Sequence, residues 1–344
     1  ITLLLLLQLG ISLLTLFIAV KFVKLFLGEA WNRLWLLIPL VFFPSQFVYC
    51  NMVMSEMLLQ LFVLLAIYFI ARLIKYSQMK DLWWSQWCIA ISMAIKPIMW
   101  LFPFVAIVSF LIHFYNKKVK LIALITFVIP FTTIALFMGY SEAKTGVWEF
   151  SSIQRKLMIN YNSFAILKEV FNEEEAAKTI SDFQNSINDL PYLEKCKRID
   201  EFNREVVVNH PMSAVKAELS GMFRFFVGHP RWDLEAFTNG ESNENNSYQF
   251  SFEIKSIFYS AYLIACALVG FILLLSFLKF IFARHISYSL RGCIASIVIY
   301  FTIVTGPSAS TRFRLPIFPV LMATFCVVAH EIYIKRKSVA TYAE

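Results

Sequence analysis

The chain has 344 residues, of which 59% are hydrophobic and only 16% are charged, with a formal net charge of +8. A soluble domain of this size does not need so much apolar surface, and several runs reach about 20 apolar residues, enough to cross a bilayer. The composition therefore excludes an ordinary soluble protein and predicts a polytopic membrane protein. The apolar runs do not alternate with polar residues as barrel strands do, so the fold class should be all-α.

Residues 1–140 are predicted to hold roughly six transmembrane helices, judged by the length of their apolar runs. The run Leu82–Phe114 is too long for one span and contains Lys96 and Pro97. We expect two short helices that meet there, because proline removes a backbone donor and disfavours helix in the residue before it. The other predicted spans of this part are Ile1–Val20, Trp31–Tyr49, Met57–Ile70 and Leu121–Tyr140.

Residues 141–255 form a polar segment with a different composition. From residue 142 to residue 255 it holds 18 acidic and 13 basic residues, a net charge of −5. Prolines at 191 and 211 mark expected helix starts. The predicted helices are Phe164–Phe183, Tyr192–Asn209 and Met212–Val227, followed by a loop at Gly240–Ser247.

Residues 256–344 are predicted to form three further transmembrane helices and a basic cytoplasmic tail. The spans are expected at Ile257–Phe280, at about 294–305 and at Ile317–Ile334. The middle span is short unless it extends toward Ser289. The six cysteines lie mostly inside apolar runs, which indicates neither a disulfide framework nor a zinc site.

Basic residues are divided unequally between the two ends of the predicted spans. Fifteen of the 31 lysines and arginines fall at one set of ends, whereas the short turns at the other ends hold only Lys96, Arg312 and Arg314. Because basic turns usually face the cytoplasm, residues 142–255 are predicted to be extracytoplasmic. The net charge is thus a topology signal, and no nucleic-acid partner is expected. The residues of the predicted cytoplasmic ends are Lys21, Lys24, Arg33, Arg72, Lys75, Lys80, Lys117, Lys118, Lys120, Lys279, Arg284, Arg291, Lys335, Arg336 and Lys337.

The turns on the predicted outer side carry four ionisable residues at the membrane boundary: Glu56, Lys96, Arg312 and Arg314. Charges at this depth are costly unless they face a wet cavity or a partner, so we expect one carboxylate and three cations to converge beneath the polar segment. Each residue also has a plainer interpretation. Glu56 would favour a helix N-terminus, Lys96 would snorkel beside a kink, and the arginines would anchor a span.

Such a set of charges suits a substrate with a phosphate at the bilayer surface and a tail in the lipid, such as a polyprenyl-phosphate-linked sugar. The planar fork of arginine fits phosphate oxygens bidentately, and a nearby cation stabilises the charge that develops as the sugar departs. Arg312, Arg314 and Lys96 are therefore the predicted lipid-phosphate-binding residues. The acceptor hydroxyl needs a carboxylate general base, for which Glu56 is an acidic candidate.

Four stretches form a pattern in their order and spacing: a Ser-Glu turn at Met54–Met57, a broken hairpin at Ala90–Pro103, the exit from the membrane at Tyr140–Ser152 and an Arg-Pro turn at Ser308–Val320. Together they resemble the polytopic GT-C glycosyltransferases, and the likeness covers most of Ile1–Ile334. In particular, they resemble the bacterial relatives of dolichyl-phosphate-mannose–protein mannosyltransferases and of the lipid A aminoarabinose transferase.

This resemblance implies a glycosyltransferase of the cell inner membrane that uses a polyprenyl-phosphate sugar donor and an acceptor that is a lipid, a glycan or a protein. It implies lipid-phosphate binding for Arg312 and Arg314, and a place in or beside the donor cavity for Glu56 and Lys96. In this family the catalytic aspartate lies in the first outer loop, and no residue here matches it. We therefore expect a fragment whose general base lies upstream of Ile1 and which does not transfer sugar by itself.

Two other function classes compete with a transferase. In a transporter or lipid flippase the same charges would line a substrate path, but such proteins often show paired broken helices, and this chain has one break without a counterpart. In a scaffold subunit of an envelope complex, replacing the arginines would leave sugar transfer unchanged. The sequence has no P-loop, no GxGxxG and no HExxH spacing, so no cofactor and no metal are expected.

Overall fold

The computed structural model describes residues 2–29, 31, 33–52, 54–114, 121–228, 230–231, 233–234, 257–284, 286–308 and 311–343. These residues form helices and turns without a strand, which confirms the all-α prediction. Six helices among them are long and apolar enough to cross a membrane, as expected for a multi-pass membrane protein. The predictions for Lys117, Lys118, Lys120 and the loop Gly240–Ser247 lie outside the described residues.

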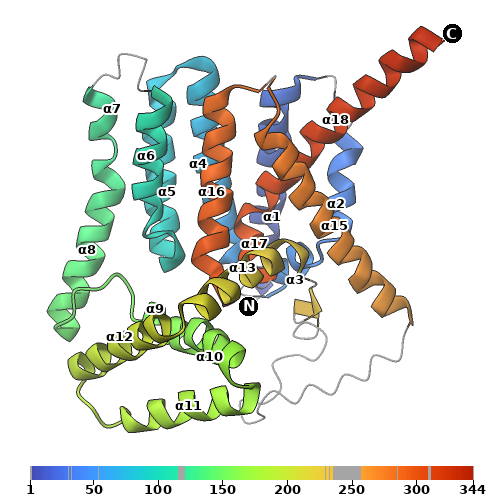
Figure 1. Ribbon diagram of the computed structural model, residues 1–344. Coiled ribbons are helices and arrows are strands. Elements are labelled where there is room, and N and C mark those ends of the chain that lie inside the picture. The colour runs from blue at the N-terminus through green and yellow to red at the C-terminus, as the bar shows by residue number, and fades with distance from the viewer. Residues whose placement is uncertain are drawn as a thin grey trace.

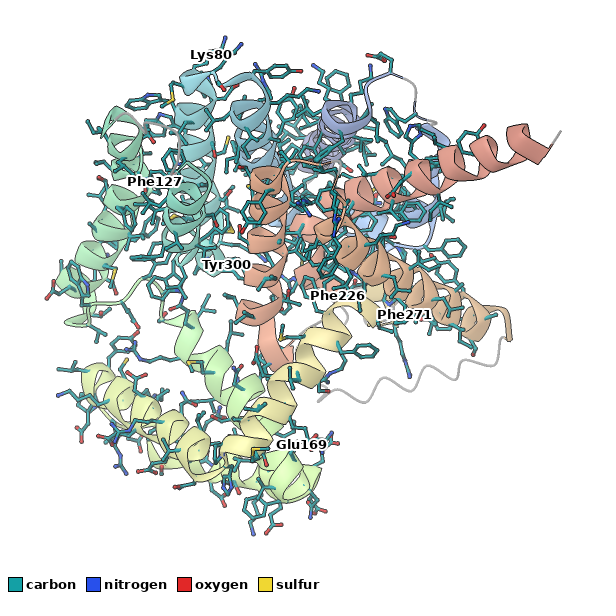
Figure 2. The ribbon with its side chains drawn as sticks, turned by 45° about the horizontal axis from the view of Figure 1, so that its top comes forward. Lys80, Phe127, Glu169, Phe226, Phe271 and Tyr300 are labelled. Carbon is teal, nitrogen blue, oxygen red and sulfur yellow. The ribbon has the colours of Figure 1, made fainter. Side chains whose placement is uncertain are left out.

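The apolar helices stand side by side as a bundle, and the helices of the polar segment form a layer across one end of it (Figure 1). We call this end of the bundle the segment end. The opposite end, where Lys80 lies, is the lysine end (Figure 2). The bundle helices are α1 (Thr2–Leu27), α4 (Glu56–Tyr76), α5 (Met79–Ile95), α6 (Phe102–Phe114), α7 (Leu121–Ile125), α8 (Val128–Thr145), α15 (Ile257–Ile281), α16 (Tyr288–Thr305) and α18 (Phe318–Ala343).

The predicted span Trp31–Tyr49 is wrong as a single helix. The chain forms a 3₁₀ turn at Arg33–Leu36, then α2 (Leu37–Val41), and after a bend at Phe42–Pro44 the short helix α3 (Ser45–Cys50). Proline lacks the backbone N–H that a helix interior needs, so Pro39 and Pro44 prevent one continuous span. The bend places α3 at the segment end of the bundle (Figure 1).

The predicted break at Lys96 and Pro97 is confirmed. Helix α5 ends at Ile95, Lys96 has an extended backbone with φ −143° and ψ 132°, and Pro97 starts a 3₁₀ turn before α6. A second interruption, between α7 and α8, divides the predicted span Leu121–Tyr140. The middle span of the last part extends back past Ser289, which was the alternative to a short span, because α16 begins at Tyr288, where the Ser287 side chain caps the helix.

In the polar segment, two of the three predicted helices are confirmed and one is divided. The prediction Phe164–Phe183 fails at Phe171, because the Asn172 side chain accepts a hydrogen bond from the Glu175 N–H at 2.8 Å and starts a new helix there. The segment consists of α9 (Ile153–Leu157), a π-helical turn (Met158–Ser163), α10 (Phe164–Val170), α11 (Glu173–Ser186), α12 (Tyr192–Asn209) and α13 (Pro211–Val227).

Helix α13 fastens the polar segment to the bundle through two very close backbone contacts. A methyl group built on Gly221 would lie 2.2 Å from the carbonyl oxygen of Gly306, and one built on Gly270 of α15 would lie 2.2 Å from that of Phe226. Only glycine permits such approaches. Phe225 and Phe226 also belong to the apolar core of the bundle. The segment is thereby held against the turn that follows Gly306 and leads into α17 (Thr311–Arg314).

Candidate functional site

Three of the four predicted site residues meet at the segment end of the bundle. Glu56 is the first residue of α4, Lys96 follows α5, and Arg312 lies on α17. The Lys96 Nζ donates a hydrogen bond to Glu56 Oε1 at 2.6 Å, and Arg312 donates to the same oxygen through Nε. Residues 256 positions apart in the chain thus share one carboxylate oxygen.

Burial is graded across this cluster. The side chain of Glu56 is 2% exposed, that of Lys96 is 23% exposed and that of Arg312 is 40% exposed. The carboxylate therefore lies on the inner side, and the guanidinium group can be reached from outside the bundle. The plainer interpretation of Glu56 as the N-terminal acid of a helix also fits its position, but its contacts go well beyond that role.

Two features of the cluster suit a ligand that carries both an anion and hydroxyl groups. One carboxylate faces two cations, so the cluster keeps a formal charge of +1 and attracts a further anion. The second carboxylate oxygen, Glu56 Oε2, is buried and has no hydrogen-bond donor among the described residues. A buried acceptor without a donor is costly, and a ligand hydroxyl would satisfy it.

The structure places Arg314 apart from this cluster. Its side chain is 2% exposed, and its guanidinium lies 4.8 Å from the centre of the Phe43 ring. It donates through Nη1 to the carbonyl of Phe226 and through Nη2 to that of Gly228 at 3.3 Å. Arg314 therefore caps the C-terminus of α13 from the bundle side, where carbonyls lack helical partners and positive charge is favourable. Its binding to lipid phosphate stays a prediction.

A second polar cluster, which the sequence did not predict, lies beside Arg314. Asp233, a buried residue of the polar segment, accepts hydrogen bonds from the Tyr49 hydroxyl at 2.9 Å and from the Ser45 hydroxyl. The ring of Tyr49 also lies 5.9 Å from the guanidinium of Arg312. Tyr49 therefore connects the exposed cluster around Glu56 with the buried one around Arg314.

Buried amides support the turn that carries the two arginines. Gln60 donates to the carbonyl of Leu315 at 2.8 Å and exchanges hydrogen bonds with Gln46 at 2.8 and 3.1 Å. Gln46 also donates to the Ser12 hydroxyl at 2.9 Å. Hydrogen-bonded polar groups inside an apolar bundle fix one arrangement of its helices. The sequence signal for this layer was the presence of glutamines inside apolar runs.

The start of the same turn lies against another acidic residue. Gly306 has φ +42°, and a methyl group built on it would lie 2.7 Å from Glu218 Oε2 on α13. Partial burial raises the pKa of Glu218 above its ordinary value. Glu218 thus places a carboxyl group beside Gly306, six residues before Arg312.

Neither a metal-binding group nor a known relative adds to these observations within the part of the chain that the structure describes. In the part of the chain that the structure describes, three or more His, Cys, Asp or Glu side chains are nowhere grouped so as to hold a metal ion. No family model, curated protein or solved structure matches this chain.

Proposed function

We propose that the protein is an integral-membrane glycosyltransferase that moves a sugar from a polyprenyl-phosphate donor to an acceptor on the extracytoplasmic face of the cell inner membrane. The observation that supports this most is the convergence of Lys96 and Arg312 on Glu56. Helix α17, which carries Arg312, lies beside α13 at the segment end of the bundle, whereas Lys80 lies at the opposite end (Figures 1 and 2). By the rule for basic turns, the segment end is the extracytoplasmic end.

The position of Arg312 fits a lipid-linked phosphate. Arg312 begins the candidate membrane span Arg312–Ile334, which includes α17 and the first part of α18, so its guanidinium lies at the boundary between the lipid and the polar segment. A polyprenyl phosphate has its charge at this depth and its tail in the bilayer. Arginine binds phosphate oxygens through charge-assisted hydrogen bonds, which stabilise the phosphate as it becomes the leaving group.

In this proposal Glu56 organises the cations and contacts the sugar. Its Oε1 already holds both Lys96 and Arg312, which keeps the two cations together when no donor is bound. Its Oε2 is buried and lacks a donor among the described residues, so it is suited to accept a hydrogen bond from a sugar hydroxyl. A carboxylate paired with two cations is a weak base, and we do not assign it the deprotonation of the acceptor.

The test is a chase experiment with membranes that contain the product of the native gene and a polyprenyl-phosphate sugar labelled in the sugar. We expect the label to move from the donor to a lipid, glycan or protein fraction, and we expect Arg312→Gln and Lys96→Met to reduce this transfer strongly. Arg198→Gln removes an exposed arginine remote from the site and is the matched control.

The same experiment separates the competing functions. If the labelled donor crosses the bilayer with its sugar still attached, the protein is a transporter or flippase and the proposal is wrong. If Arg312→Gln transfers sugar as fast as the unchanged protein, the cation cluster has no part in the chemistry, as expected of a scaffold subunit.

A further inference from the structure

Helix α13 has two apolar faces, and only one of them is covered. Ala217, Gly221 and Phe225 face the rest of the protein and are buried. On the opposite side, Met212 is 80% exposed and Leu219 is 60% exposed. The full exposed stripe, at spacings of three and four residues, consists of Met212, Val215, Leu219 and Phe223. Such spacing places these four side chains on one face of the helix.

An exposed apolar face of this length indicates an interaction surface. A helix that is apolar on opposite sides is normally buried on both, and an exposed apolar surface marks an interaction site. The exposed residues Val207 and Val208, at the end of α12, add apolar surface beside the start of α13.

The position of α13 indicates what covers this face. Phe226, in its last turn, stacks on Phe277 of the apolar helix α15 with ring centres 6.2 Å apart. Phe223 lies one turn before Phe226, so the stripe begins where the spans end. Of the segment helices, α13 lies directly beneath the bundle, whereas α11 lies farthest from it (Figure 1).

Polar and basic residues border the stripe on one side. Lys216, Ser220 and Arg224 recur at intervals of four residues, next to the apolar positions. Lys216 is paired with Glu169 of α10, and Arg224 donates to the carbonyl of Ser220. Helices that lie in a membrane interface have this arrangement, with apolar residues toward the acyl chains and basic residues at the level of the lipid phosphates.

We propose that the exposed stripe of α13 lies in the lipid leaflet at the segment end, so that α13 is an interfacial helix in contact with the bilayer. The occupant of the face is lipid, because the stripe is continuous with the apolar helices of the bundle and is bordered by cations. This inference does not depend on the proposed function. Contact with lipid sets the depth of α13 in the membrane. Because Gly221 of α13 packs against Gly306 and Arg314 caps the end of α13, it also sets the depth of the turn that carries Arg312 and Arg314.

The experiment is site-directed spin labelling in nanodiscs that hold one protein each. All six native cysteines are free and buried, so a thiol label should react with an introduced exposed cysteine. Leu219→Cys and Phe223→Cys report on the stripe. Glu201→Cys, at a position on α12 whose side chain is 62% exposed, is the matched control. For each spin label, the experiment compares two relaxation enhancements. One is caused by dissolved oxygen, which is enriched in lipid, and the other by a water-soluble nickel chelate.

We expect the labels at 219 and 223 to be relaxed by oxygen and shielded from nickel, and the label at 201 to show the reverse. Nickel access at 219 equal to that at 201 would place the stripe in water and overturn the proposal. Shielding from both reagents at 219 would also overturn it, because it would mean that protein covers the face. A single copy per nanodisc excludes a second chain as the source of the lipid-like result.

Discussion

Two arginines that stand two residues apart on the same short helix have opposite surroundings. Arg312 is 40% exposed and shares a carboxylate oxygen with Lys96 at the boundary of the bundle. Arg314 is buried, lies over the Phe43 ring and donates to two backbone carbonyls at the end of α13. The first is open to an incoming anion, whereas the second is enclosed by the fold and uses two of its nitrogens to hold the end of α13.

The difference shows that the partners within reach, more than the residue type, decide what a membrane-boundary arginine does. Next to Arg312 the chain offers a carboxylate and an open side. Next to Arg314 it offers helix C-terminal carbonyls, which attract a cation. We therefore expect changes at Arg314 to act on stability and changes at Arg312 to act on binding.

The largest effect on stability is expected from Arg314→Ala. It leaves the carbonyls of Phe226 and Gly228 without their donor, and each buried unsatisfied group costs about 1–3 kcal/mol. We expect a total loss of about 3 kcal/mol or more, measured by thermal unfolding in detergent. Arg312→Ala is the matched control and should cost no more than about 1 kcal/mol, because the Arg312 side chain is 40% exposed and Lys96 still pairs with Glu56. Equal losses for the two variants would contradict the division of roles.

The next largest effect is expected from Gly270→Ala. The added methyl group would lie 2.2 Å from the carbonyl oxygen of Phe226 and 3.1 Å from Arg314 Nη1, so it disturbs both the helix end and its cap. Overpacking of this kind typically costs about 1–3 kcal/mol. Gly139→Ala on α8, where a methyl group meets nothing within 4 Å, should be neutral or slightly stabilising. The measurement is thermal unfolding of both variants. Equal stability of Gly270→Ala and Gly139→Ala would contradict the close contact between Gly270 and the Phe226 carbonyl.

A smaller effect is expected from Tyr49→Phe, which removes the hydroxyl that donates to Asp233 and keeps the ring beside Arg312. The loss of this buried hydrogen bond should cost about 1–2 kcal/mol. Binding of a polyprenyl phosphate should stay unchanged, because the ring remains. A variant with normal stability and weakened binding would show that Tyr49 belongs to the ligand site.

The smallest effect concerns the pH dependence of stability at Glu218. Burial raises its pKa in the folded state above the unfolded value, so its stabilising contribution is complete below the unfolded pKa and is lost as pH rises through the folded pKa. Glu218→Gln should therefore gain stability relative to the unchanged protein as the pH increases from about 4 to about 8. Glu201→Gln, at an exposed position, should show no such trend.

Composition and apolar run length were enough to predict the helical membrane fold, because lipid leaves few ways to satisfy a backbone. The break at Lys96 and Pro97 was predicted correctly, because a proline ends the preceding helix whatever the rest of the fold does. The span Trp31–Tyr49 was predicted wrongly, because its apolar composition outweighed Pro39 and Pro44 in the prediction.

The site was predicted in part. The convergence of Glu56, Lys96 and Arg312 follows from their shared position at one end of the spans. The separation of Arg314 could not be predicted, because it depends on where the last turn of α13 lies. Asp233 could not be selected among the 18 acidic residues of the segment, since only the fold brings it to Tyr49.

The most direct measurement is the affinity of the purified protein in nanodiscs for a polyprenyl phosphate, with Arg312→Gln against Arg198→Gln. A charge-assisted hydrogen bond contributes about 1.5–3 kcal/mol, so we predict that Arg312→Gln weakens binding by about 10- to 100-fold while leaving the protein folded. Arg198→Gln should bind as the unchanged protein does. Unaltered affinity in the folded Arg312→Gln variant would contradict the assignment of this cluster as the phosphate site.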